Sequence, residues 1–349
     1  MSENLPLVSV VTPVYNGEKY LVECIESVLA QDYWNWEYLL VNNCSTDSTR
    51  DIAVCYSKKH ARIRVHSFEE FLPVIENHNR ALRLISTDSK YCKVVSADDR
   101  LMPECIARLV EIAEENPSVG VVGSYQLFGG GAKWGIGFGG LPYPAAVVAG
   151  RDICRWHLLG KPYVFGNPTS VLYRSDLIRK TENFYPNSRE QADVSVCYKI
   201  LQSADFGFVH QILSYCRYHG SSLSTEAARI GTSVASLLVD HFEYGHVYLT
   251  KREYEKRLRE VLHEYYKYLA KGILHFRDRK FWTFHTGILA ELALPLVSTR
   301  LISAMFAVLL DLLLDPRQTV EIMRRMNANK RSLRRAARAA TVDMTTGTR

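Results

Sequence analysis

VSVVTPVYNGEKYLVECIESVLAQDYWNWEYLLV, residues 8–41, is the stretch that decides the fold. The run from Leu7 to Val11 is rich in β-branched residues and predicts a first strand, ended by Pro13. From Glu18 to Ala30 the apolar residues recur at helical spacing, and Trp36 to Val41 has the pattern of a second buried strand. A strand, a helix and a strand in this order form a βαβ unit, which predicts two parallel strands joined by a right-handed crossover.

Strand and helix patterns continue to alternate as far as about residue 220. This alternation predicts an α/β domain with a Rossmann-like, mostly parallel sheet flanked by helices. A glycine-rich stretch from Gly129 to Gly140 predicts a mobile surface loop of the kind that covers ligands. The further strands are predicted at residues 63–65, 91–95, 119–123, 169–173 and 206–218, and the further helices at 48–56, 76–86, 103–115 and 192–202.

The pattern changes near residue 225, where strand-like runs give way to helical periodicity rich in Tyr, Leu and charged residues. We therefore predict a first domain over residues 1–225, a helical region over 226–330 and a basic tail over 331–349.

The segment from Leu292 to Leu314 is the most apolar part of the chain, but Pro295, Arg300 and Asp311 interrupt it. It is too broken for a helix that crosses a membrane. Two interpretations stay open. The segment is either a buried helical hairpin or an amphipathic helix that lies on a membrane surface.

The net charge of +6 is concentrated at one end of the chain. Residues 317–349 carry nine Lys and Arg against only Glu321 and Asp343, whereas the rest is nearly balanced. This distribution argues against nucleic acid as a partner, and the tail is a solvated segment or a contact for an anionic surface. The eight cysteines form no CxxC pair and the N-terminus has no secretory-signal pattern, so we expect a reduced, cytoplasmic location.

Aromatic and polar residues follow the first two strands, at the edge of the sheet where open α/β folds bind ligands. Pro13 and Tyr15 come after the first strand, and Asn43 comes after the second. Tyr15 can stack on a nucleobase, and the Asn43 amide offers one acceptor and one donor to an imide edge. Alternatively, Asn43 and Asp47 cap the following helix, and for Asp47 the two roles are equally open.

Asp98 and Asp99 follow the strand predicted at residues 91–95. Adjacent carboxylates repel each other unless a cation neutralises them, and oxygen ligands favour Mg²⁺ or Mn²⁺ over zinc. Such a cation would hold a diphosphate group. An Asp-Asp pair alone also fits a helix cap or a solvated turn.

The sequence resembles the inverting glycosyltransferases of family 2, which have a GT-A fold. The resemblance is carried by VSVVTPVYNGEKYLVECIESVLAQDYWNWEYLLVNNCSTDST at residues 8–49 and VVSADDRLMPE at 94–104, and it covers roughly residues 7–220. It implies an enzyme that transfers a sugar from a nucleoside-diphosphate sugar, with UDP or dTDP as the expected nucleotide, to an acceptor hydroxyl. No covalent glycosyl-enzyme is implied.

The resemblance also implies roles for single residues. The family's aspartates after the fourth strand bind the metal and the nucleotide ribose, and these roles transfer to Asp98 and Asp99. Ser96 replaces a further aspartate of the family pattern, which leaves open which carboxylate is the primary metal ligand. Asn43 replaces the family's base-contacting acid. An asparagine can still pair with uracil or thymine, but it does not point to UDP specifically.

Asp193 matches the family's catalytic base, with Ala192 at the companion position and Glu190 as the alternative base. Without the resemblance, Asp193 equally fits an acidic residue favoured by a helix N-terminus. Arg217 and His219 match an Arg-x-His segment near the diphosphate, and they alternate along an extended strand, so they face the same way. Residues 166–170 resemble the family's acceptor-side loop.

By resemblance, such enzymes build bacterial surface polysaccharides or glycolipids from saccharide or lipid-linked acceptors at the inner face of the membrane. We therefore expect peripheral membrane contact through residues 292–349, where the apolar segment is followed by basic residues. Two other classes stay open. One is a nucleotide-sugar-binding protein without transferase activity, and the other is a dinucleotide enzyme, which the lack of GxGxxG after the first strand disfavours.

Overall fold

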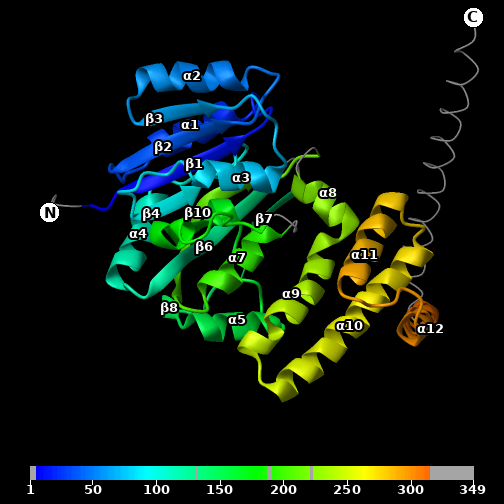
Figure 1. The fold of residues 1–349 in the computed structure, drawn as a ribbon. Coiled ribbons are helices and arrows are strands. Elements are labelled where there is room, and N and C mark those ends of the chain that lie inside the picture. The colour runs from blue at the N-terminus through cyan, green and yellow to red at the C-terminus, as the bar shows by residue number, and fades with distance from the viewer. Residues whose placement is uncertain (1–4, 131–132, 138, 187–190, 221–222, 315–349) are drawn as a thin grey trace, which may run out of the picture. The chain divides into compact units, whose positions relative to one another are not determined.

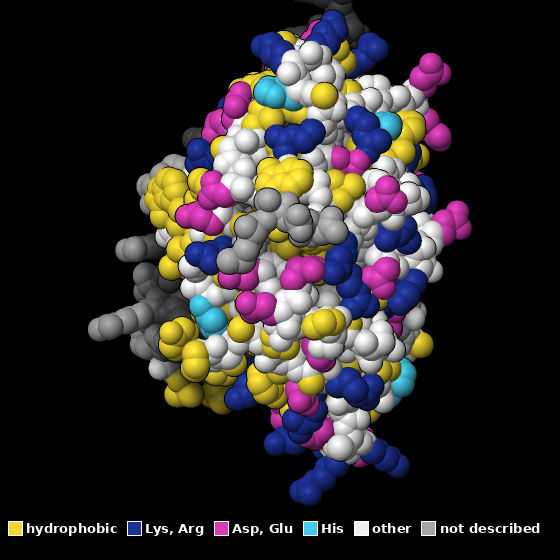
Figure 2. All heavy atoms as spheres, turned by 90° about the vertical axis from the view of Figure 1, so that its left-hand side faces the viewer, with side chains coloured by type: hydrophobic (Ala, Val, Ile, Leu, Met, Phe, Trp, Pro, Cys, Tyr) yellow, Lys and Arg dark blue, Asp and Glu magenta, His cyan; other side chains and the backbone are white. Residues whose placement is uncertain are grey.

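The structure is a computed structural model that describes residues 5–130, 133–137, 139–186, 191–220 and 223–314 (Figure 1). The chain divides into two compact units between Thr225 and Glu226. The first unit contains a twisted sheet between helices, and the second is helical. Figure 2 shows basic and acidic side chains interspersed over the face that it draws.

The first unit is built on one sheet with the strand order β3-β2-β1-β4-β9-β6-β10-β5, in which β7 also pairs with β6 and β8 with β10. The pairs β1–β2, β2–β3, β1–β4 and β6–β10 are parallel, whereas β9 is antiparallel to both β4 and β6. The α/β class is confirmed, with a sheet that is parallel in its first half and mixed beyond β4. The strands are β1 (Val8–Val14), β2 (Trp36–Asn42), β3 (Ile63–Ser67), β4 (Tyr91–Val94), β5 (Arg100–Leu101), β6 (Val119–Gly130), β7 (Lys133–Gly137), β8 (Val147–Val148), β9 (Val171–Arg174) and β10 (Asp205–Arg217).

The βαβ unit forms as predicted, but the prediction that Pro13 lies beyond the first strand is wrong. β1 continues to Val14, and Pro13 lies opposite Val41 of β2. In a parallel strand, alternate residues direct their backbone groups to alternate neighbours. Val11 bonds on the β4 side, where its carbonyl accepts from the Val95 amide, and pairing with β4 ends there. Pro13 points to that same side, so its missing N–H removes no sheet hydrogen bond.

Helices α1 (Leu21–Leu29), α2 (Thr49–Lys59) and α4 (Cys105–Glu115) pack in one core with alternate residues of the strands. In α1 the buried residues Leu21, Cys24, Ile25 and Val28 recur at helical spacing, and they meet Val8 and Val10 of β1. Other helices contact β1, β9, β6 and β10. They are α3 (Val74–Leu82), α6 (Ser175–Arg179), α7 (Ala192–Ile200) and α5 (Gly150–Leu158), and a short 3₁₀ helix, η1 (Pro168–Ser170), precedes β9.

The glycine-rich stretch is a β-hairpin rather than the predicted loop, as far as its residues are described. β6 runs to Gly130 and β7 returns antiparallel beside it, with Gly129 opposite Trp134. A Cβ atom on Gly129 would lie 2.3 Å from the Trp134 ring, and one on Gly137 would lie 1.7 Å from the Phe128 ring. The glycines are therefore strand positions over which large rings lie, a role that a composition argument does not distinguish from a flexible loop.

The second unit has its own core between long helices. Tyr265, Phe281 and Leu289 are buried, and the fully buried His285 bonds through Nδ1 to the Tyr265 hydroxyl at 2.8 Å and through Nε2 to the Ile230 carbonyl at 3.0 Å. Over the part of the chain that is described, no helix is long and apolar enough to cross a membrane. The helices are α8 (Leu223–Ile230), α9 (Thr232–Tyr248), α10 (Lys251–Leu274), α11 (Arg279–Glu291) and α12 (Thr299–Leu314).

The hairpin provides a test with an internal control. A Cβ atom on Gly130 would come within 1.9 Å of the Tyr218 carbonyl oxygen, whereas one on Gly135 would meet nothing within 4 Å. We expect Gly130→Ala to lower the free energy of unfolding by about 1–3 kcal/mol, since overpacking displaces backbone, and Gly135→Ala to change it by less than about 0.5 kcal/mol. Urea denaturation of both variants measures this. Equal effects would show that the hairpin is not packed against Tyr218.

Candidate active site

The site is centred on Asp99, which lies just beyond β4 and is 2% exposed. Its Oδ2 accepts a hydrogen bond from the Thr169 hydroxyl at 2.6 Å, and its Oδ1 accepts from the Arg217 backbone amide at 3.1 Å. Thr169 belongs to η1 and Arg217 ends β10, so three distant segments meet on one carboxylate. Burial and the neighbouring Asp98 charge raise the pKa of Asp99 to about 6.

Asp98 is more exposed, with 32% of its side chain accessible. Its Oδ2 lies 2.9 Å from Nε2 of His219, and its backbone carbonyl accepts from Nε of Arg217 at 3.1 Å. Four residues predicted from the sequence, Asp98, Asp99, Arg217 and His219, therefore lie together. We call these four and Thr169 the carboxylate cluster.

The Arg217 guanidinium connects the cluster to the start of α1. It donates to Oε2 of Glu23 at 2.7 Å and lies over the Tyr20 ring, 4.4 Å from its centroid. The His219 ring is 5.2 Å from the same Tyr20 ring. Sequence reasoning missed Tyr20 and Glu23, since positions in the first turns of an amphipathic helix give no signal of their own.

A fully buried lysine supports the cluster from inside the sheet. Lys93 of β4 donates through Nζ to the Thr169 carbonyl and, at 3.0 Å, to the Val171 carbonyl. Burial lowers its pKa to about 8. A lysine within the apolar strand YCKVV was a visible anomaly that could have drawn attention to it. Lys93 fixes the backbone of the residue whose hydroxyl binds Asp99.

The predicted base-binding residues lie on the loops after β1 and β2. Pro13 is buried within β1, and the Tyr15 side chain is half exposed and makes an edge contact with Phe71, at 4.9 Å between ring centroids. Asn43 is 3% exposed, donates through Nδ2 to the Leu72 carbonyl at 2.8 Å and accepts through Oδ1 from the Leu72 amide at 3.1 Å. The polar atoms expected to bind a base therefore hold the segment that carries Phe71.

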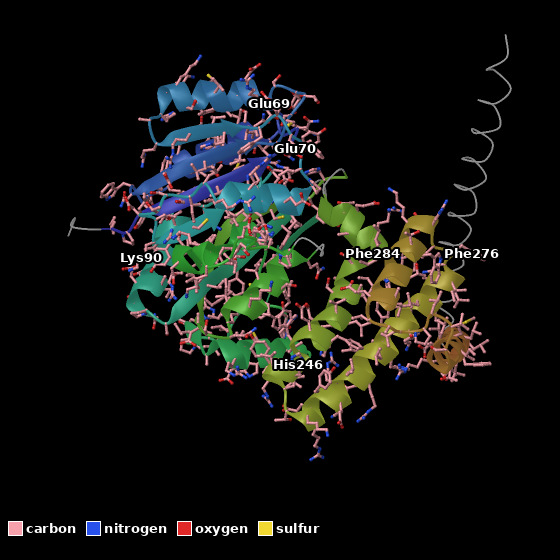
Figure 3. The ribbon with its side chains drawn as sticks, in the orientation of Figure 1. Glu69, Glu70, Lys90, His246, Phe276 and Phe284 are labelled. Carbon is pink, nitrogen blue, oxygen red and sulfur yellow. The ribbon has the colours of Figure 1, made fainter. Side chains whose placement is uncertain are left out.

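That segment links β3 to α3, and Figure 3 labels Glu69 and Glu70 on it. Arg80 of α3 donates to Oδ1 of Asn43 at 2.8 Å and to the Glu70 carbonyl at 3.2 Å, and it lies over the Phe68 ring. Sequence reasoning missed Phe71 and Arg80, because nothing local marks a loop residue that returns to another loop.

Asp47 precedes Ser48, which is the N-cap of α2, and its side chain bonds to the backbone of both loops. Its Oδ1 accepts from the Thr49 amide at 3.0 Å at the start of α2, and its Oδ2 accepts from the Glu18 amide at 3.1 Å. Asn16 bonds to Ser45 and Thr46 across the same gap. The two loops are thus joined into one rigid edge.

Asp193 lies in the first turn of α7, and its Oδ1 accepts from the Val194 amide at 3.0 Å. Burial raises the pKa of Asp193 to about 6, which is the range of a general base that works near neutral pH. No hydrogen bond joins it to the carboxylate cluster over the described residues. The alternative base, Glu190, lies outside the described residues.

The carboxylate cluster fits a divalent cation that has only one or two protein ligands. Across the described part of the chain, no group of three or more His, Cys, Asp and Glu side chains has the arrangement of a complete metal site. Mg²⁺ is typically held by one or two carboxylates together with substrate phosphates, and Asp98 and Asp99 supply that number. Burial and the Asp98 charge both disfavour the ionised form of Asp99, and a bound cation would favour that form.

Comparison with known proteins gives the chain its relatives. The sequence model of the family described as Glycosyl transferase family 2 matches residues 9–136. The putative teichuronic acid biosynthesis glycosyltransferase TuaG of Bacillus subtilis is 34% identical over 122 residues, which is 35% of this chain and 48% of that protein. Glycosyltransferase GlyG of Streptococcus pneumoniae serotype 4 is 28% identical over 233 residues, 63% of this chain and 74% of GlyG.

Solved structures share the fold. Staphylococcus aureus TarS 1–349 in complex with UDP-GlcNAc superposes with a TM-score of 0.61 and 18% identity, over 86% of this chain and 89% of that chain. The mannosyltransferase PcManGT from Pyrobaculum calidifontis, in complex with GDP-Man and Mn²⁺, gives a TM-score of 0.53 and 16% identity, over 93% and 86%. The predicted GT-A fold is confirmed, while the match to TuaG spans only about half of that relative.

Proposed function

We propose that this chain is an inverting glycosyltransferase that moves one sugar from a nucleoside-diphosphate sugar to an acceptor hydroxyl, and the match of residues 9–136 to the model of glycosyl transferase family 2 supports this. The observation that supports this most is the carboxylate cluster, in which Asp98 and Asp99 lie against Arg217 and His219. Acidic groups for a cation beside basic groups for a diphosphate are what the departure of a nucleoside diphosphate requires.

The donor nucleotide binds along the edge formed by the loops after β1 and β2. The exposed rings of Tyr15 and Phe71 offer faces for the base. Asn43 acts here by holding the Leu72 backbone, and thereby Phe71, beside Tyr15. Asp98 binds the ribose of the donor nucleotide. We expect this nucleotide to be UDP or dTDP.

Transfer is a single displacement. The acceptor oxygen attacks the anomeric carbon, the bond from that carbon to the phosphate oxygen breaks, and its electron pair leaves with the diphosphate. Asp193 accepts the acceptor proton. Arg217 and His219 balance the growing charge on the leaving group. Glutamate and tyrosine contacts hold the Arg217 guanidinium in place before the donor arrives.

Mg²⁺ or Mn²⁺ held by Asp98 and Asp99 would neutralise the diphosphate as it leaves. The acceptor is a saccharide or a lipid-linked saccharide in the synthesis of a bacterial surface polysaccharide or glycolipid. TuaG, named for teichuronic acid biosynthesis, supports this class of product.

The catalytic proposal is tested by replacing Asp193. Asp193→Asn should lower the turnover rate by about 10²–10⁴-fold, because a general base contributes that much, and should leave donor affinity close to normal. The wild-type rate should also fall as the pH drops below about 6, since burial raises the pKa of Asp193 to about 6 and the protonated carboxyl accepts no proton. Steady-state kinetics over a screen of UDP-, dTDP- and GDP-sugars measure both. A normal rate in the variant would transfer the role to Glu190.

The cation is tested by binding as well as by turnover. We expect Asp98→Ala and Asp99→Ala to abolish turnover and to weaken Mn²⁺ binding in the presence of UDP, followed by electron paramagnetic resonance. The thermal midpoint should stay near that of the wild type for Asp98→Ala and should fall for Asp99→Ala, because the Thr169 hydroxyl and the Arg217 amide lose their buried acceptor. Asp51→Asn, at an exposed site in the first turn of α2, is the control. Full activity in excess chelator would contradict the proposal.

A lipid-linked acceptor lies in a membrane, and α12 offers a surface that could contact that membrane. The inner face of α12, with Leu301, Ala304 and Val308, is buried in the core of the second unit. Its outer face exposes large apolar residues, which are Ile302, Phe306, Leu309, Leu310 and Leu313. The basic sequence that follows lies outside the described residues and complements an anionic surface. We propose peripheral attachment at the inner face of the cell membrane through α12 and this segment.

Vesicle binding tests the attachment. The full-length protein should co-sediment with anionic vesicles at low salt and be released at high salt, because salt screens the attraction of the basic segment. Phe306→Ser should weaken binding, since Phe306 is 69% exposed on α12, while Trp34→Ser, at a residue 58% exposed in the first unit, should not. If the protein does not bind anionic vesicles at low salt, the membrane proposal is wrong, and the exposed face of α12 is instead a contact surface for protein.

A further inference from the structure

A pocket of about 500 Å³ adjoins the carboxylate cluster on the side of Arg217 and His219. Its walls come from α1, β5, β10 and the β6–β7 hairpin. Tyrosine and tryptophan side chains line it together with the charged side chains of Glu23 and Arg100, and the aromatic residues are Tyr20, Trp134, Tyr215 and Tyr218. None of the roles assigned so far uses Trp134 or Arg100.

Trp134 is held in one orientation and yet is exposed. Its ring lies against the backbone of Gly129, where a Cβ atom would come within 2.3 Å, and 5.6 Å from the Tyr215 ring at an interplanar angle of 30°. Even so, 62% of the residue is accessible. A single exposed tryptophan needs no explanation, but a fixed one on the wall of a pocket offers a flat apolar face to a ligand.

The polar wall is fixed by shared contacts. Arg100 and Arg217 lie 3.4 and 2.7 Å from the same Oε2 atom of Glu23. Both guanidinium groups also lie over the Tyr215 ring, at 4.5 and 5.5 Å from its centroid. Rings and charged planar groups thus hold each other, and the pocket offers several donors and carboxylate acceptors beside the apolar face of Trp134.

A sugar ring has this combination of surfaces, with C–H groups on its faces and hydroxyls at its edge. We propose that the pocket binds a pyranose ring, with a C–H face on Trp134 and hydroxyls toward Glu23 and Arg100. The inference rests on the proposed function, since the pocket adjoins the residues assigned to the diphosphate. The ring comes from the donor sugar or from the acceptor, and the same chemistry recognises both.

The test compares Trp134→Ala with Trp134→Phe, which keeps a ring, and with the exposed-tryptophan control Trp34→Ala. Calorimetry with UDP alone and with UDP- and GDP-linked hexoses, and saturation-transfer NMR with free hexoses and N-acetylhexosamines, give the affinities. Trp134→Ala should bind UDP as the wild type does and lose about tenfold in affinity for a sugar-bearing ligand, while Trp134→Phe loses less and Trp34→Ala nothing. Arg100→Ala should give the same selective loss, which guards against a local rearrangement of the hairpin.

The outcomes separate the two sources and the two claims. Loss for the nucleotide sugar but not for the free sugars places the donor ring in the pocket, and loss for the free sugars alone places the acceptor ring there. Unchanged affinity of Trp134→Ala and Arg100→Ala for every sugar-bearing ligand that the wild type binds overturns the inference while the proposed function stands. Absence of nucleotide binding in the wild type overturns the proposed function itself.

Discussion

A carboxylate taken out of water needs hydrogen-bond donors around it, and the first unit is organised so that Asp99 has them. The donors come from η1 and from the end of β10, which lie far from β4 in the sequence. Lys93 fixes the same 3₁₀ segment from the interior, so the Thr169 hydroxyl has little freedom to leave Asp99. The sheet order β4-β9-β6-β10 is what brings these segments to one point.

The loops after β1 and β2 lie at the other end of this edge of the sheet. Their backbone conformation, rather than a buried charge, is what the surrounding contacts hold. Asn16 and Cys44 adopt positive φ angles of 50° and 57° in the loops after β1 and β2. Such angles are costly for residues other than glycine unless surrounding contacts hold them, and here side-chain hydrogen bonds join the two loops. The loops therefore hold the backbone around Tyr15 by contacts within the protein, which would reduce the entropy lost if Tyr15 binds the nucleobase as proposed.

The second unit meets a different constraint. One stripe of α12 completes the core of the unit, and the other apolar stripe has no partner over the described residues. Packing in the core of the unit accounts for the buried stripe of α12 but not for its exposed apolar stripe. The exposed stripe is consistent with the proposed peripheral attachment to a membrane, where a lipid-linked acceptor would lie.

The sequence by itself determined the βαβ start and the α/β class, and it marked Asp98, Asp99, Arg217 and His219 as candidates for one site. Periodicity and ordered motifs are local properties, so they can be read along the chain. Only the tertiary structure decided which group each polar atom meets. Thr169 lies 70 residues from Asp99, and Leu72 lies 29 residues from Asn43, so no local pattern pairs them.

The glycine-rich hairpin also shows what local sequence cannot predict. Its composition is that of a loop, and it becomes a strand pair because Trp134 and Phe128 lie over glycines of the neighbouring strand. Hydrogen bonds and ring contacts across a sheet depend on which strands become neighbours. That choice is made by the burial of the whole sheet between its helices, which is a property of the folded chain and not of any segment.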